Sequence, residues 1–261
     1  EFYLRLSGAV MVGLPSAALA MLAIAAALAG APSAPSWPRL ALSALLMALA
    51  LQTKLLAAII APGAAAAIFY TGAANAHWWP QDWRRRLTAV LAWGALTVVL
   101  YLLAGFVLGA LHFDLLFGTH FSTLTRSLED FIEGSTLFFP HLIEQHVAFL
   151  LLGGLGLVYA VRRRAVMVIA PLAWIVTGVA AFSVHRPLWY HHTIILTIPL
   201  SWLCAYGVAA LWAALRRAWE LRRQPQGVIT AALALGAVAA VALVFWFYPN
   251  PYPERLEWQM T

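Results

Sequence analysis

The sequence alternates between long apolar runs and short polar segments, a pattern typical of a chain that crosses a membrane several times. Most of the runs approach about 20 residues, the length that a helix needs to span the apolar part of a bilayer. We predict about seven transmembrane helices, in the runs 7–30, 40–70, 87–111, 147–161, 165–184, 193–215 and 227–248. The expected fold class is an all-α, polytopic helical membrane protein.

The run 40–70 is too long for one ordinary span and is interrupted by Gln52-Thr53-Lys54 and by Pro62-Gly63. We interpret it as two short helices that meet near Lys54, with a single kinked span as the alternative. A lysine between apolar helices is a candidate functional residue, because a charge that faces lipid is costly. A lysine at a helix end can also extend its ammonium group to the membrane surface. Both interpretations of Lys54 are open from the sequence alone.

The longest polar segment, 112–146, is predicted to be an external loop that carries an amphipathic surface helix. Its apolar residues Leu124, Leu128, Phe131 and Ile132 recur at helical spacing, with charged residues between them. A solvated loop that touches the membrane surface explains this pattern better than a source of catalytic carboxylates. In the run 147–161, the three nearby glycines Gly153, Gly154 and Gly156 predict close packing against another helix.

The segment 185–192 is a compact cluster of polar and aromatic residues between two apolar runs. Arginine offers a bidentate fork to a phosphate or carboxylate, and histidine offers a titratable donor. Trp189 and Tyr190 suit a sugar or a lipid head group, although tryptophan and tyrosine also gather at any membrane interface. The residues that we select here as candidates for binding an anionic substrate group are His185, Arg186, Tyr190, His191 and His192.

Composition supports the membrane assignment, and the distribution of charge sets an orientation. Hydrophobic residues make up 63% of the chain, and the mean hydropathy is +0.83, whereas soluble domains are roughly half apolar. The net charge of +6 comes from arginine clusters at 84–86, 162–164 and 216–223, which follow every second predicted crossing. By the positive-inside rule these clusters are cytoplasmic, so 112–146, 185–192 and the tail 249–261 are expected outside. Clusters at helix ends do not form a nucleic-acid groove, and we expect no nucleic-acid partner.

Motifs of soluble enzymes are missing from the sequence. It contains no nucleotide-binding glycine loop, no HExxH pair and no serine elbow. No group of histidines and carboxylates has the spacing of a recognised metal site, so no metal ligand is assigned. The single cysteine, Cys204, lies within an apolar run and excludes an intramolecular disulfide.

Three stretches together resemble the membrane glycosyltransferases of the GT-C superfamily, in particular the bacterial protein-O-mannosyltransferase-like and aminoarabinose-transferase-like enzymes. They are 6–15, 46–54 with its Thr-Lys ending, and 185–211 with Pro199. The resemblance implies an inverting transferase of the inner membrane that moves a sugar from a polyprenyl-phosphate-linked donor to an acceptor on the extracytoplasmic face. It also implies that Lys54 and Arg186 stabilise the negative charge of the leaving phosphate.

Members of this superfamily place acidic catalytic or metal-binding residues in a first external loop, which leaves a divalent metal ion open as cofactor. We expect the chain to begin after that loop, as a fragment of a longer protein, so no general base is assigned. The expected domains are a transmembrane module over 1–248 and an extracytoplasmic tail over 249–261. Two alternatives remain open: a transporter or flippase for a lipid-linked substrate, and a catalytically inactive membrane fragment.

Overall fold

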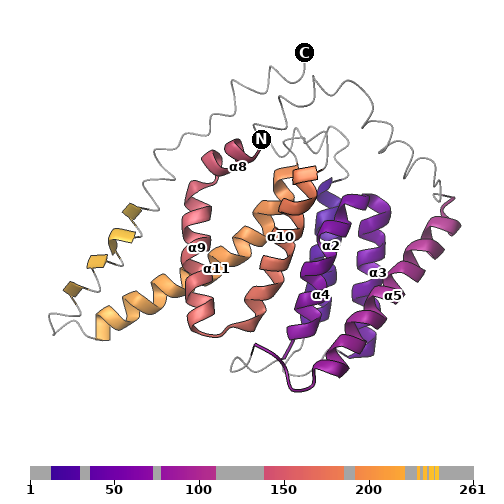
Figure 1. The fold of residues 1–261 in the computed structure, drawn as a ribbon, viewed down its shortest axis with the longest axis horizontal. Coiled ribbons are helices and arrows are strands. Elements are labelled where there is room, and N and C mark those ends of the chain that lie inside the picture. The colour runs from indigo at the N-terminus through magenta and orange to yellow at the C-terminus, as the bar shows by residue number, and fades with distance from the viewer. Residues whose placement is uncertain are drawn as a thin grey trace, which may run out of the picture. The chain divides into compact units, whose positions relative to one another are not determined.

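The computed structural model describes residues 13–29, 36–72, 78–109, 138–184 and 192–220, together with short pieces between 228 and 240. Every regular element in these ranges is a helix, so the predicted all-α class is confirmed for the described part of the chain (Figure 1). In the described part of the chain, three helices are long and apolar enough to cross a membrane: α5 (Trp83–Val107), the helix over Val166–Ser183 and α11 (Thr193–Glu220). The bent pair α8 and α9 brings the number to four if it forms one span.

The chain divides into two compact units, and the first comprises residues 1–136 and 163–199. Its helices, apart from α5 and the first turns of α11, are α2 (Gly13–Leu28), α3 (Trp37–Thr53), the 3₁₀ helix η1 (Leu55–Ile59), α4 (Ala61–Tyr70), the 3₁₀ helix η4 (Val166–Val168) and α10 (Ile169–Val184). In α2, Ala20, Ala23 and Ala27 are buried at helical spacing. Small side chains on one face allow a neighbouring helix to approach closely. This face of α2 packs mainly against α3.

The apolar run 40–70 folds as two helical limbs that meet at Lys54, as the first of the two interpretations predicted. Lys54 has an extended backbone (φ −158°, ψ 122°), and this ends α3 before η1 and α4 begin. Near the end of α3, Gln52 Nε2 donates a 2.6 Å hydrogen bond to the carbonyl of Tyr101, late in α5. At the end of α4, the carbonyl of Phe69 accepts from Arg86, early in α5. The two limbs therefore run in opposite directions, and Lys54 lies at the turn between them.

Two further contacts fix the direction of α10 in the first unit. A Cβ on Gly63 would lie 2.8 Å from Trp174 Cβ, and a Cβ on Gly178 would lie 3.5 Å from the side chain of Ile59. Later residues of α10 therefore face earlier residues of the η1–α4 limb, so α10 ends on the same side as Lys54. Glycine at position 63 permits this approach, because no side chain fits between the two backbones.

The second unit comprises residues 137–162 and 200–261, and its described helices are α8 (Phe138–Gln145), α9 (Val147–Arg162) and the remainder of α11. A Cβ on Gly156 would lie 2.0 Å from the carbonyl oxygen of Leu203, whereas one on Gly154 would meet nothing within 4 Å. The predicted glycine-mediated packing is thus confirmed, with Gly156 at the contact and Gly154 away from it. The thiol of Cys204 donates to the carbonyl of Phe149, 3.2 Å away, which adds a polar link between α9 and α11.

The last part of the predicted loop 112–146 is helical, because α8 occupies Phe138–Gln145. Phe138, Phe139, Leu142 and Ile143 recur at helical spacing, and Pro140 stands in the first turn, where its missing N–H costs nothing. The bend between α8 and α9 is 78°. Charged residues elsewhere in the segment 112–146 concealed this short apolar face. The expected surface helix over 124–133 lies outside the described residues.

Candidate functional site

Lys54 is held at the turn between the two limbs by backbone hydrogen bonds on both sides. Its N–H donates to the carbonyl of Ala50 at 3.0 Å, and its own carbonyl accepts from the N–H of Ala57 at 3.0 Å. The Ser16 hydroxyl donates to the carbonyl of Ala50 at 2.9 Å and approaches that of Lys54 at 3.4 Å. The start of α2 is thereby fastened to the end of α3. The lysine backbone is fixed by contacts from three elements.

A recess lies beside this turn, and we call it the Lys54 recess. The residues that line it are Ser16, Ala17, Lys54, Leu56, Ala57, Ile60, His192, Ile194 and Ile195. Its walls are mainly apolar, and Ser16, Lys54 and His192 are the residues with polar side chains among them. The free volume is about 20 Å³, which admits one water molecule and not a sugar ring.

His192 lines the same recess although it is far from Lys54 in the sequence. It is almost fully buried, and its ring stacks on Phe182 with a centroid separation of 5.6 Å and an interplanar angle of 16°. Phe182 belongs to the end of α10, and α11 begins at Thr193, directly after the histidine. The imidazole is thus fixed by an aromatic neighbour, while Ile194 and Ile195 of α11 contribute apolar wall beside it.

The electrostatics of the recess are dominated by Lys54, which is the only lysine in the 261-residue sequence. It lies in the turn between helices, and an anion bound in the recess would favour its charged form. A half-buried ammonium and an imidazole at one recess are suited to bind a phosphate or carboxylate oxygen, whereas the Ser16 hydroxyl already donates its proton to the carbonyl of Ala50.

Of the six predicted substrate-binding residues, the structure describes two, Lys54 and His192, and brings both to the same recess. The other four, His185, Arg186, Tyr190 and His191, lie outside the described residues. Within the described ranges, no three His, Cys, Asp or Glu side chains come close enough together to hold a metal ion.

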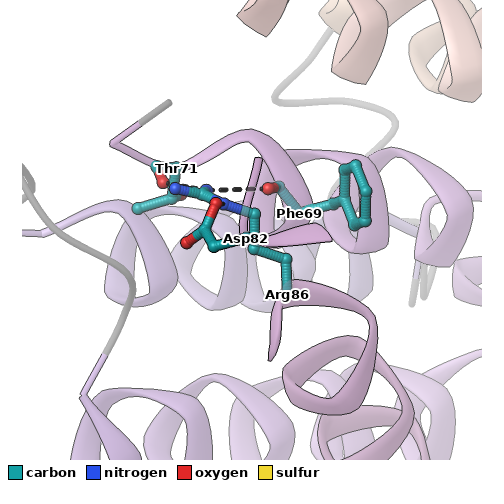
Figure 2. A network of polar contacts seen from close by, with 4 residues as sticks. All are labelled: Phe69, Thr71, Asp82 and Arg86. Atoms are coloured by element: carbon teal, nitrogen blue, oxygen red, sulfur yellow. Dashed lines mark hydrogen bonds and ion pairs between the residues drawn. The ribbon is translucent and has the colours of Figure 1, made fainter. Parts of the chain in front are cut away.

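Arg86 has a structural role that sequence analysis did not identify. Its side chain is 7% exposed, and it pairs with Asp82 and donates to the backbone carbonyls of Phe69 and Thr71 (Figure 2). These carbonyls belong to the C-terminal end of α4, where the last helical oxygens have no partner within the helix. Arg86 therefore caps α4 from α5. The sequence feature that could have indicated this role is Asp82, which stands four residues before Arg86, at the spacing of an ion pair within a helix.

Comparison with known proteins gives no match: no family model matches the chain, and no curated protein or solved structure is significantly similar to it. The resemblance to GT-C glycosyltransferases therefore rests on the three sequence stretches alone.

Proposed function

We propose that this chain is the membrane-embedded part of a glycosyltransferase that takes its sugar from a polyprenyl-phosphate-linked donor. The observation that carries the proposal is the meeting of Lys54 and His192 in one recess at a turn between apolar helices. The two residues come from separate stretches of the sequence that resemble GT-C enzymes. The alternative of a lysine that merely extends to the membrane surface does not account for the fixed backbone or for the buried histidine.

The chemistry of such a donor fits the character of the recess. When the glycosidic bond breaks, negative charge develops on the lipid phosphate, and a fixed cation stabilises that charge most where water is excluded. The ammonium of Lys54 would supply the cation, and His192 would donate a hydrogen bond. Leu56, Ile194 and Ile195 offer apolar surface beside them, which suits the lipid portion of the donor. The general base stays unassigned.

The proposal includes an orientation in the inner membrane with about seven spans. Arg86 lies at the far end of the α4 limb from Lys54, in the arginine cluster 84–86. The positive-inside rule assigns that end to the cytoplasm, so the recess would face the extracytoplasmic side. A donor sugar presented at the outer membrane surface would then meet its acceptor there.

The test uses the full-length protein in proteoliposomes with a polyprenyl-phosphate-linked sugar, and measures transfer of the sugar to water or to an acceptor. We expect Lys54→Ala to lower the rate about 100-fold, the effect of removing one donor from a developing anion. We expect Lys54→Arg to recover part of the loss. Arg216→Ala, a change to an exposed residue paired with Glu220, serves as control and should leave the rate unchanged.

Three outcomes would overturn the proposal. Full activity in Lys54→Ala would remove the assigned role of the recess. Movement of the donor across the bilayer with its sugar intact would favour a flippase. Failure of the wild-type protein to release or move any of a panel of polyprenyl-linked sugars would favour an inactive membrane protein.

A further inference from the structure

The beginning of α5 carries a connected group of aromatic rings and arginines that the Lys54 recess does not involve. The Trp79 ring is tilted against two neighbouring rings, with its centroid 5.7 Å from that of Phe69 and 5.9 Å from that of Trp83. The guanidinium carbon of Arg84 lies 5.5 Å from the centre of the Trp83 ring. Trp79 is 60% exposed, and both Arg84 and Arg85 are exposed. We call Trp79, Trp83, Arg84 and Arg85 the tryptophan–arginine cluster.

The three consecutive arginines of α5 have different roles. Arg86 points inward and takes the only nearby described carboxylate, Asp82, as its partner. Neither Arg84 nor Arg85 forms an ion pair with any residue in the ranges that the structure describes, and the first turn of α5 contains no acidic residue. The exposed side of the cluster therefore keeps two positive charges.

The position of the cluster on α5 indicates what it faces. Beyond Arg84, exposed apolar residues continue along the same helical face at intervals of three, four and seven: Leu87, Leu91, Val98, Leu102 and Phe106. The 25 residues of α5 extend about 37 Å, enough to cross a bilayer. Arg84 thus stands at the end of an apolar stripe that would contact acyl chains. In a bilayer that α5 crosses, its guanidinium would lie near the lipid head groups.

We propose that the tryptophan–arginine cluster binds the phosphate of an anionic phospholipid at the membrane surface where α5 begins. Arg84 and Arg85 supply charge and hydrogen-bond donors for the phosphate. Trp79 and Trp83 supply rings of the kind that settle at the head-group level, and Trp83 orients the Arg84 guanidinium by its ring face. The apolar stripe below accepts the acyl chains of the same lipid. This inference needs α5 to lie in a membrane and is independent of the proposed transferase activity.

The experiment measures binding of phosphatidylglycerol and of zwitterionic phosphatidylcholine to the purified full chain in detergent, by native mass spectrometry. We expect the wild type to prefer phosphatidylglycerol. The double variant Arg84→Gln/Arg85→Gln should bind it about 25-fold more weakly, at about fivefold for each arginine, with phosphatidylcholine binding unchanged. Trp79→Leu, which keeps the charge but removes the ring that packs against Trp83, should weaken binding about threefold. Raising the salt concentration should weaken the wild type as well.

The matched control is Arg216→Gln/Arg217→Gln, which removes the same charge from the end of α11. An equal loss in this control would mean that lipid binding follows net charge, and would overturn the assignment to the cluster. Unchanged phosphatidylglycerol binding in Arg84→Gln/Arg85→Gln would overturn it directly. If that variant does not fold, the measurements on Trp79→Leu and at raised salt decide. Phosphatidylglycerol binding that stays unchanged in either measurement rejects the proposal.

Discussion

Replacing Arg86 by alanine is the most direct test of how the first unit is held together. The guanidinium joins the end of α4 to the start of α5 through the carbonyls of Phe69, at 2.9 Å, and Thr71, at 2.5 Å. Asp82 holds it from the opposite side. The change to alanine removes all three contacts at once and leaves the buried Thr71 carbonyl without this donor.

The expected magnitude follows from the number and type of these contacts. A hydrogen bond from a charged donor contributes about 1.5–3 kcal/mol, so the two carbonyls account for at least about 3 kcal/mol. The ion pair adds less than about 1 kcal/mol, because the Asp82 side chain is 45% exposed and regains water when the pair is lost. The Arg86→Ala variant no longer has to desolvate a guanidinium, which offsets part of the loss. We therefore expect a net destabilisation of about 3 kcal/mol.

The assay is thermal unfolding of the purified chain in detergent, followed by circular dichroism. A change of about 3 kcal/mol corresponds to a fall in melting temperature of roughly 6–12 °C for a protein of this size. Arg85→Ala, the exposed neighbour on the same helix turn, is the control and should stay within about 0.5 kcal/mol of the wild type. Equal melting temperatures for Arg86→Ala and Arg85→Ala would refute the capping role of Arg86.

Three further predictions test other contacts. The hydrogen bond from Arg86 lowers the pKa of the Asp82 carboxyl. The stabilisation that the Asp82–Arg86 pair gives the folded state is therefore complete above the unfolded-state pKa of about 3.9. It disappears as the pH falls through the lower pKa that Asp82 has in the folded state. The melting temperatures of wild type and Asp82→Asn should converge once the pH is below the folded-state pKa of Asp82, and a constant gap would contradict this. Gly156→Ala forces a methyl group into the backbone of α11 and should lower the free energy of unfolding by about 2–3 kcal/mol. The control Gly154→Ala should lower it by less than about 0.5 kcal/mol. Equal effects of the two variants would reject the close approach of α9 and α11. Ser16→Ala removes a buried hydrogen bond to the last turn of α3 and should lower the free energy of unfolding by about 1 kcal/mol. Unchanged hydrogen exchange in that turn would disprove the link between α2 and α3.

Local features of the fold could be predicted from the sequence because they depend on neighbouring residues. The interruption at Gln52-Thr53-Lys54 predicted a helix end there, and the structure has an extended residue at that point. Gly153 and Gly156 predicted close packing, and both meet α11. The long apolar runs predicted helices, of which three to four have the length and apolarity of a span in the described ranges. The remainder of the predicted seven stays a prediction.

Contacts between distant segments could not be predicted in the same way. The sequence distinguishes Arg86 from the two other arginines of 84–86 only by Asp82 four residues earlier, and that spacing does not reveal that Arg86 turns inward to the end of α4. Charge topology indicated that Lys54 and His192 share one side of the membrane. Their meeting in one recess depends on how closely α10 approaches the limb that contains Gly63, which no periodicity reveals.

If the hairpin at Lys54 lies in a membrane, as we propose, it has a consequence for how the chain enters the lipid phase during synthesis. With 17 residues in α3 and 16 from Leu55 to Tyr70, each limb is shorter than the roughly 20 residues that insert as an independent span. Carrying a lysine alone into the bilayer centre costs about 2.5–3.5 kcal/mol. Both limbs would have to leave the translocation machinery together. The free energy gained by placing their combined apolar surface in lipid would then offset the cost of moving the Lys54 charge across the bilayer. A substitution that breaks the pairing of the limbs should therefore first appear as a failure of membrane integration, before any change in the folded state can be measured.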